Sequence, residues 1–157
     1  MNNNIDMALK ALMEFALAKN ETDRETARDH LMAVYTGHTA EKKDPEVLIY
    51  RVLMDIGAPD HLLGHRYVVR AAQMLLEKPD QINDILGMYE RLAKEFHTSA
   101  SKVERAIRHL VEVTWTRSDW ERLDKCFGNI SDPNKGKPVN GEFLDRLANI
   151  IRLQLRS

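Results

Sequence analysis

The sequence predicts an all-α protein. Apolar residues recur at three- and four-residue steps in several segments, whereas the strict alternation of a half-buried strand is nearly absent. Aromatic residues make up only 6% of the chain, and Leu, Ala, Glu, Lys and Arg are abundant, which is typical of helices. We expect about six helices in a domain over residues 44–157, built around a helix-turn-helix. A helical extension and linker over residues 1–43 should precede it.

The extension is expected to form a helical hairpin followed by a polar linker. Apolar side chains at helical spacing predict a first helix over residues 4–18. Thr22, followed three residues later by Glu25, matches a capping box and predicts a second helix over residues 23–35. Two short helices bury little apolar surface alone, so we expect them to pack on the domain or on a second copy of the chain.

Three helices are expected in the first half of the domain, over residues 45–57, 59–78 and 82–96. Asp44 should cap the first of them, with Pro45 at its first position, where a missing N–H costs nothing. Asp80 or Asn83 should cap the third helix. Its apolar positions include Leu86, which we expect to face the core together with its neighbours on the same side of the helix.

The segment after these helices, LAKEFHTSASKVERAIRHLVEVTW at 92–115, predicts the helix-turn-helix. Ala93 is small enough for a second helix to approach closely, and Phe96 should fill the turn. His97 occupies the turn position that often holds Gly, and His tolerates the left-handed conformation better than most residues. Ser99 can accept a hydrogen bond from the amides that open the next helix, although Ser101 offers an alternative start.

The second helix of this motif has an apolar and a polar face. Its apolar stripe consists of Val103, Ala106, Ile107, Leu110 and Thr114. Arginine can donate two hydrogen bonds to guanine, and Glu can accept one from cytosine N4. A lysine can contact either a base or a phosphate. An amphipathic helix with a solvated charged face is the alternative interpretation. The candidate base contacts are Lys102, Glu104, Arg105, Arg108 and His109.

Candidate phosphate contacts flank this helix. Two of them belong to a loop between residues 128 and 141, where exposed lysines could equally make no contact. The loop follows a short helix that Ser118 should cap, and Asn140 should cap a last helix over residues 141–156. We expect Trp115 and Trp120 in the core, because they lie at helical spacing beside other apolar residues. The candidate phosphate contacts are Ser99, Ser101, Arg117, Lys135 and Lys137.

Three stretches of the chain resemble a known family of bacterial response regulators. They are DIGAPDHLLGHRYVVRAA at 55–72, KEFHTSASKVERAIRHLVEVTW at 94–115 and KGKPVNGEFLDRLANIIRL at 135–153. Over about residues 47–156 the chain is similar to the C-terminal DNA-binding domain of the stage-zero sporulation protein A family. The resemblance implies sequence-specific binding to double-stranded DNA in transcription control. Residues 1–43 cannot supply the alternating strands and helices of a receiver domain, so we do not expect control by receiver phosphorylation.

The same resemblance implies two protein contacts. The last helix would contribute to the pairing of neighbouring domains, so a homodimer could form through it or through the N-terminal helices. The short helix would carry a surface for the sigma factor of RNA polymerase, although a solvated face explains its charges equally well. The residues of this candidate surface are Asp119, Glu121, Arg122, Asp124 and Lys125.

Composition bounds the remaining possibilities. The net charge is −1, so a DNA-binding surface has to be local, and residues 97–117 carry four cationic against two acidic side chains. A single cysteine, Cys126, excludes an internal disulfide, fits the reducing cytoplasm and is expected to be buried rather than nucleophilic. His61 and His65 have a spacing that can hold a metal ion, but no Cys lies near them and we expect no metal. We found neither a signal peptide nor a membrane-spanning stretch.

These observations leave two functional hypotheses. The leading one is a DNA-binding transcription regulator, because the basic residues gather on one face of the predicted recognition helix. The alternative is a protein-interaction module that keeps the fold and titrates a regulator or RNA polymerase without binding DNA. No enzyme and no cofactor are expected, since the chain has no Gly-rich phosphate loop and no nucleophile in a motif.

Overall fold

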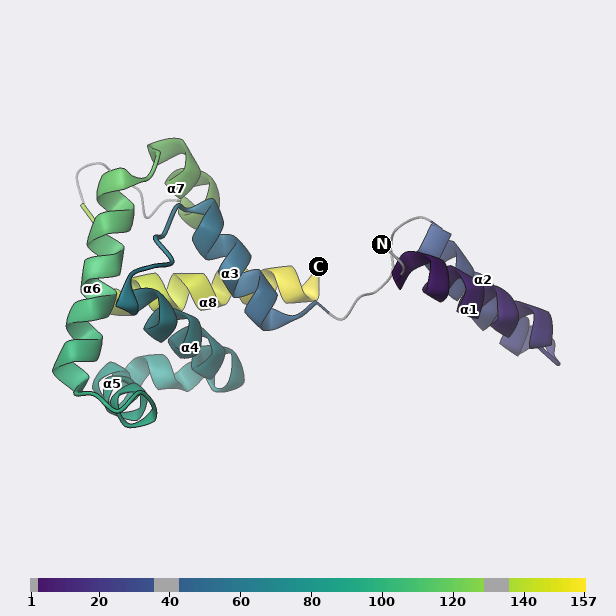
Figure 1. Cartoon of the computed structure of the whole chain (residues 1–157), viewed down its shortest axis with the longest axis horizontal. Helices are drawn as coiled ribbons and strands as arrows, with labels where there is room; N and C mark the ends of the chain where they lie inside the picture. The colour runs from purple at the N-terminus through teal and green to yellow at the C-terminus, as the bar shows by residue number, and fades with distance from the viewer. Residues whose placement is uncertain (1–2, 36–42, 129–135) are drawn as a thin grey trace. The chain divides into compact units, whose positions relative to one another are not determined.

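The computed structural model describes residues 3–35, 43–128 and 136–157, and the chain divides into two compact units, residues 1–43 and 44–157 (Figure 1). The described residues form eight α-helices and one 3₁₀ helix, with no strand among them. The predicted all-α class is therefore confirmed. Across these described ranges, no helix has the length and apolar character that crossing a membrane requires.

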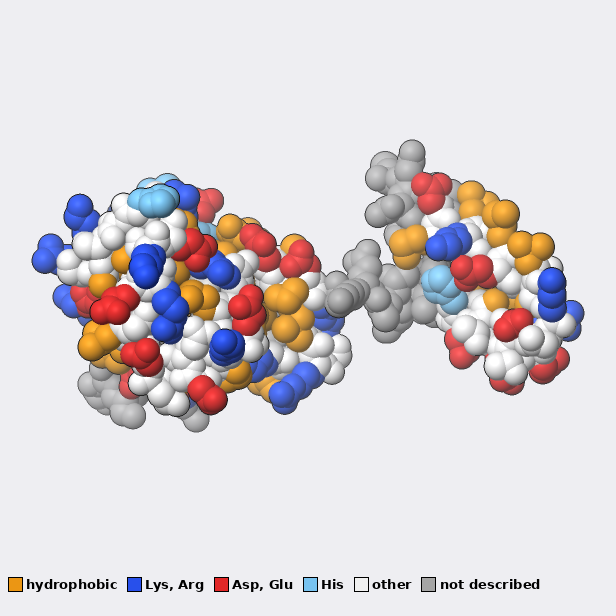
Figure 2. Space-filling view, turned by 90° about the horizontal axis from the view of Figure 1, so that it is seen from below, with side chains coloured by type: hydrophobic (Ala, Val, Ile, Leu, Met, Phe, Trp, Pro, Cys, Tyr) orange, Lys and Arg blue, Asp and Glu red, His pale blue; other side chains and the backbone are white. Residues whose placement is uncertain are grey.

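The N-terminal unit is a hairpin of α1 (Asn3–Leu17) and α2 (Glu21–Tyr35). Its two helices pack through small side chains, since Ala11 and Ala27 are the hydrophobic residues buried between them. Six larger apolar side chains of the hairpin are exposed, and Figure 2 shows hydrophobic side chains in a row along this unit. The exposed ones are Leu9, Leu12, Met13, Phe15, Leu17 and Met32.

The second helix of the hairpin begins two residues earlier than the sequence predicts. Asn20 is the cap, because its side-chain oxygen accepts a hydrogen bond from the Asp23 amide at 2.8 Å. The predicted cap Thr22 lies inside the helix, where its carbonyl accepts a hydrogen bond from the Thr26 hydroxyl at 3.0 Å. The predicted capping box was wrong because Asn20, two residues before Thr22, caps the helix instead.

The C-terminal unit is a helical domain arranged around α4. This helix packs against four others, α3, α5, α6 and α8, and nine of its fifteen residues are buried (Figure 1). A helix that is buried on most sides serves as the centre of a domain. The elements of the domain are α3 (Pro45–Asp55), α4 (Leu63–Glu77), η1 (Pro79–Asp84), α5 (Ile85–Glu95), α6 (Ala100–Arg117), α7 (Trp120–Phe127) and α8 (Asn140–Arg156).

Two helices of the domain begin later than predicted. α4 begins at Leu63 instead of Pro59, and the residues between them form turns. The expected helix over residues 82–96 is a 3₁₀ helix as far as Asp84 and becomes α-helical only afterwards. Asp84 is the cap of α5, because its carboxylate accepts a hydrogen bond from the Gly87 amide at 3.0 Å. Asp80 and Asn83, the two caps expected from the sequence, do not cap α5.

The expected caps of α7 and α8 also have other roles. Asp119 caps α7, with its carboxylate 3.2 Å from the Glu121 amide that donates to it. Ser118, the expected cap, donates a hydrogen bond of 2.6 Å to the Ile56 carbonyl and so ties the end of α6 to the end of α3. Asn140 is the first residue of α8, and its side chain turns into the domain instead of capping the helix.

An aromatic cluster joins α6, α7 and α8. The Trp115 ring lies 5.7 Å from that of Phe127 and 5.9 Å from that of Phe143, both in edge-on geometry. Trp115 thus packs against the core as predicted, whereas Trp120 is 44% exposed and the prediction for it is wrong. Leu86, which we also expected to face the core, is 70% exposed on α5.

Gly64 brings the central helix into direct contact with the backbone of α6. A Cβ atom at this position would lie 2.1 Å from the Ala106 carbonyl oxygen, a distance that no side chain tolerates. Only glycine therefore lets α4 and α6 approach this closely. The contact fixes α6 against the centre of the domain, with its other side available to a partner.

Candidate DNA-binding surface

The turn between α5 and α6 has the backbone geometry of a helix-turn-helix. The Phe96 amide donates to the Leu92 carbonyl and the Thr98 amide to the Ala93 carbonyl, both at 2.9 Å, which closes the end of α5. His97 lies between them with φ = 54°, the left-handed conformation predicted for it. The turn therefore forms with histidine at the position that often holds glycine.

Ser99 begins α6. Its hydroxyl accepts a hydrogen bond from the Lys102 amide at 3.3 Å, and its carbonyl accepts one from the Val103 amide at 3.1 Å. The alternative start at Ser101 is wrong, because that residue already lies in the first turn of the helix. The Ser99 hydroxyl is thus engaged in capping, which limits what else it can contact.

Four of the five residues of the predicted apolar stripe of α6 are buried, and the fifth, Ala106, is half-buried against the core. Val103, Ile107, Leu110 and Thr114 have no exposed surface, and Val111 joins them. The Thr114 hydroxyl is satisfied inside the core by donating to the Leu110 carbonyl at 2.7 Å. Burial along this stripe fixes the rotation of α6 and hence determines which side chains face outward.

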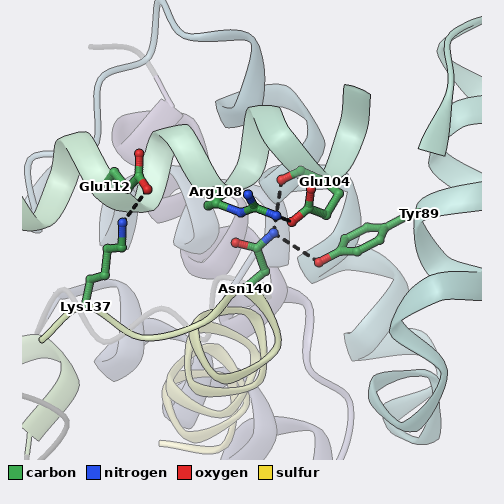
Figure 3. Close-up of polar contacts among 6 residues, drawn as sticks. All are labelled: Tyr89, Glu104, Arg108, Glu112, Lys137 and Asn140. Carbon is green, nitrogen blue, oxygen red and sulfur yellow. Dashed lines mark hydrogen bonds and ion pairs between the residues drawn. The ribbon is translucent and has the colours of Figure 1, made fainter. Parts of the chain in front are cut away.

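The outward face of α6 carries the candidate base contacts. Lys102, Arg105, Arg108 and His109 are exposed, while Glu104 is half-buried. Arg108 forms an ion pair with Glu104 one turn earlier, so these two side chains engage each other in this structure (Figure 3). In the part of the chain that the structure describes, no carboxylate forms an ion pair with Lys102 or Arg105.

Asn140 holds the backbone of α6 from the start of α8 (Figure 3). Its side-chain amide donates to the Tyr89 hydroxyl at 3.0 Å and to the Glu104 carbonyl at 3.1 Å. Burial raises the pKa of the Tyr89 hydroxyl, and the hydrogen bond from Asn140 partly offsets this effect. The pair links α5, α6 and α8 at the candidate surface. Sequence reasoning missed this role, because a helix cap was the simpler interpretation of Asn140.

The segment before α8 adds one cation to this surface. Lys137 forms an ion pair with Glu112 on α6, and the hydrogen bond from its ammonium group lowers the pKa of the Glu112 carboxyl (Figure 3). Lys137 and Arg108 also line a groove of ≈ 590 Å³ between α5, α6 and the start of α8. The other loop candidate, Lys135, lies outside the described residues.

The remaining phosphate candidates lie at the two ends of α6. Ser99 and Ser101 are exposed at its start, where orphan amides also point outward. Arg117 is exposed at its last residue. Together with Lys137, these side chains therefore lie on both sides of the candidate base contacts along the helix.

The candidate sigma-factor surface lies on α7. Its five residues are exposed, whereas Leu123 and Phe127 on the opposite side are buried. Cys126 is partly buried, and burial raises the pKa of its thiol. A nucleophilic cysteine needs a lowered pKa, so this environment is that of a packing residue.

The two histidines with metal-binding spacing lie in different environments. His65 is buried, with its ring 5.6 Å from that of Tyr50, and burial lowers the pKa of its imidazole although Asp60 raises it in part. His61 is exposed one turn earlier. Within residues 3–35, 43–128 and 136–157, no group of three His, Cys, Asp or Glu side chains could hold a metal ion.

A left-handed turn, a capped second helix with a buried stripe and an outward basic face define a helix-turn-helix DNA-binding domain. The family model for the C-terminal domain of the sporulation initiation factor Spo0A matches residues 49–151, and the chain belongs to this family. It therefore contains a DNA-binding effector domain of the sporulation-regulator type. The resemblance inferred from the three sequence stretches is confirmed.

Proposed function

We propose that this chain binds double-stranded DNA sequence-specifically and regulates transcription in the cytoplasm, with α6 as the recognition helix. The observation that carries the proposal is the exposed basic face of α6 on a helix whose rotation is fixed by its buried apolar residues. A rigid helix of this kind can enter the major groove and present side chains to base edges. In this proposal, the DNA-binding activity is not controlled by phosphorylation of a receiver domain.

The side chains proposed to contact bases differ in whether they are already paired with another side chain of the protein. Arg105 is exposed and can donate two hydrogen bonds to a guanine directly. Arg108 and Glu104 are paired with each other, so both must exchange partners if Glu104 is to accept from a cytosine. Lys102 and His109 are also exposed on α6 and complete the proposed set.

The proposed phosphate contacts fix the domain on the duplex. Ser99, Ser101 and Arg117 lie at the ends of α6 and Lys137 lies beside its middle, so they can contact the backbone on both sides of the groove. Lys135 is kept in this set on the grounds of its charge and its place in the same segment of the sequence. Such contacts position the protein and carry no sequence information.

A second partner proposed for the domain is the sigma factor of RNA polymerase. The exposed charged residues of α7 support this assignment, since its apolar side is turned to the core. The surface comprises Asp119, Glu121, Arg122, Asp124 and Lys125. A partner would therefore meet a polar, mixed-charge face, as is usual at interfaces that form transiently.

The N-terminal hairpin is proposed to pair with the hairpin of a second copy. Its internal contact uses alanines, so α1 keeps large apolar side chains exposed on its other sides. A short amphipathic helix gains most of its stability from packing its apolar face, so these exposed side chains favour a covering partner. α8 offers a second route to a homodimer, because Leu153 near its end is 67% exposed.

A direct test separates the proposed function from the alternative, a protein-interaction module that does not bind DNA. The full chain is titrated into a labelled duplex that carries the target element of the family and into a scrambled duplex, each at two salt concentrations. We expect the specific duplex to bind about 10³-fold more tightly or better, with both affinities falling as salt rises. Equal, weak binding to both duplexes would favour the interaction module.

A further inference from the structure

Two carboxylates of α6 hold the two cations beside the middle of the recognition helix. Glu104 pairs with Arg108, and Glu112, two turns after Glu104, pairs with Lys137 from the segment before α8 (Figure 3). Glu112 was not among the side chains to which the sequence assigned a role. Its contact with Lys137 joins residues 25 positions apart, so it arises from the fold rather than from helical spacing.

The Glu112–Lys137 pair contributes little to stability. The Glu112 and Lys137 side chains are 42% and 47% exposed, and solvent screens an exposed ion pair so that it adds little to stability. A structural role is therefore a weak explanation for this contact. The position of the pair suggests a role in DNA binding instead, because the pair lies on the surface proposed to face the DNA backbone.

The charges around Glu112 belong to that surface. Lys137 lowers the pKa of its carboxyl most, through the hydrogen bond and then through its charge, and His109 and Arg108 lower it further. Glu112 thus stays ionised among three cationic or potentially cationic side chains of the candidate site. An unpaired carboxylate there would repel the phosphates of any duplex.

We propose that Glu112 is a built-in counterion of Lys137 that restrains the affinity of this domain for DNA of any sequence. The inference rests on the proposed function. A phosphate that approaches Lys137 must compete with Glu112, so this lysine contributes less than a full phosphate contact and less counterion release. Glu112 therefore lowers affinity without reading a base.

The test uses the full chain and four variants: Glu112→Gln, Lys137→Gln, the double variant, and Glu77→Gln, which makes the same charge change on α4. Affinity is measured by fluorescence anisotropy on the specific and scrambled duplexes over a series of salt concentrations. Glu112→Gln should bind both duplexes several-fold more tightly. Its plot of log K against log salt should steepen by about 0.9, the value of one additional phosphate contact.

The other variants decide whether Lys137 is the cation involved. Lys137→Gln should bind both duplexes more weakly than the parent, and adding Glu112→Gln to it should leave the salt slope unchanged. Glu77→Gln should change neither affinity nor slope appreciably, and the melting temperatures of all four variants should stay near that of the parent.

Three results would overturn the inference while the parent still binds DNA. They are an unchanged slope in Glu112→Gln, equal steepening in the Lys137→Gln background, and weaker binding by Glu112→Gln. The last would mean that Glu112 aims Lys137 at a phosphate instead of withholding it. A parent chain that binds neither duplex would contradict the proposed function itself, and the inference with it.

Discussion

The apolar stripe of α6 and the apolar residues of α1 follow the same helical spacing but have different surroundings. In the domain, Val103, Ile107 and Leu110 are fully buried in a core shared by several helices. In the hairpin, α1 buries Ala11 completely, whereas Leu12 is 49% exposed. Periodicity thus predicts a helix in both places, but only the domain supplies the neighbours that cover it. This difference supports the proposal that a second copy of the hairpin covers these residues.

Deletion of residues 1–43 should have the largest effect, on assembly. We expect the full chain to sediment as a dimer and the deleted chain as a monomer, with the melting temperature of the domain nearly unchanged. In the full chain, Leu12→Glu should act like the deletion, because a charge on the exposed apolar side of α1 opposes burial. Arg28→Glu on the polar side of α2 serves as the control. An unchanged mass after the deletion would show that the hairpin does not mediate assembly.

Truncating one side chain in each region measures how differently they are packed. Ile107→Ala should lower the free energy of unfolding of the domain by about 2–5 kcal/mol, since it leaves a cavity in a fully buried stripe. Leu12→Ala should change it by less than about 0.5 kcal/mol, as is usual for exposed positions. Urea denaturation of both variants checks the contrast, and comparable losses would mean that the hairpin is part of the domain core.

The link between α5, α6 and α8 should have an intermediate effect. Tyr89→Phe removes the acceptor of one Asn140 hydrogen bond and should lower the free energy of unfolding by about 1 kcal/mol. Because Asn140 still reaches the Glu104 carbonyl, DNA affinity should fall less than stability. Urea denaturation and DNA titration of one preparation separate the two quantities. A full loss of DNA binding in a folded variant would show that Tyr89 itself contacts the duplex.

The smallest effect concerns pH. Burial lowers the pKa of His65 in the folded domain below its ordinary value of 6.5, so the unfolded state binds the proton more readily. The stability contributed by this group is fully present above pH 6.5 and is lost as the pH falls through 6.5 towards the lowered pKa. Unfolding measured at about pH 7.5 and about pH 5.5 should show this loss, and His65→Gln should reduce it. A loss that is identical in the variant would assign the pH dependence to other groups.

Sequence reasoning predicted what depends on local pattern. The left-handed His97, the cap at Ser99 and the buried stripe of α6 all follow from neighbouring residues and were found as expected. Contacts across the fold were not predictable in this way. Asn140 and Ser118 matched helix caps in sequence, yet their side chains bond to segments 36 and 62 residues away. Whether such a side chain caps its own helix or bonds to a distant segment depends on which groups the packed fold brings next to it.

The roles of the surface residues stay predictions for a similar reason. Exposure and charge place Arg105 and Arg108 on the outer face of α6, and helical spacing allows Glu104 to pair with Arg108. Spacing did not indicate that Lys137 pairs with Glu112, which lies 25 residues away. The Leu86 error has the same origin, since an apolar residue at helical spacing lies beside the groove instead of in the core. A pattern identifies the face of a helix, whereas partners depend on elements far away in sequence.

The central claim is that the outer face of α6 reads bases, and Arg105→Ala tests it most directly. Binding of the parent, this variant and the control Arg51→Ala is titrated on the specific and the scrambled duplex, with melting temperatures measured alongside. We predict that Arg105→Ala loses about 1–3 kcal/mol on the specific duplex, relaxes preference at one base pair and melts like the parent. If the folded variant binds both duplexes as the parent does, α6 does not recognise DNA through Arg105 and the claim is contradicted.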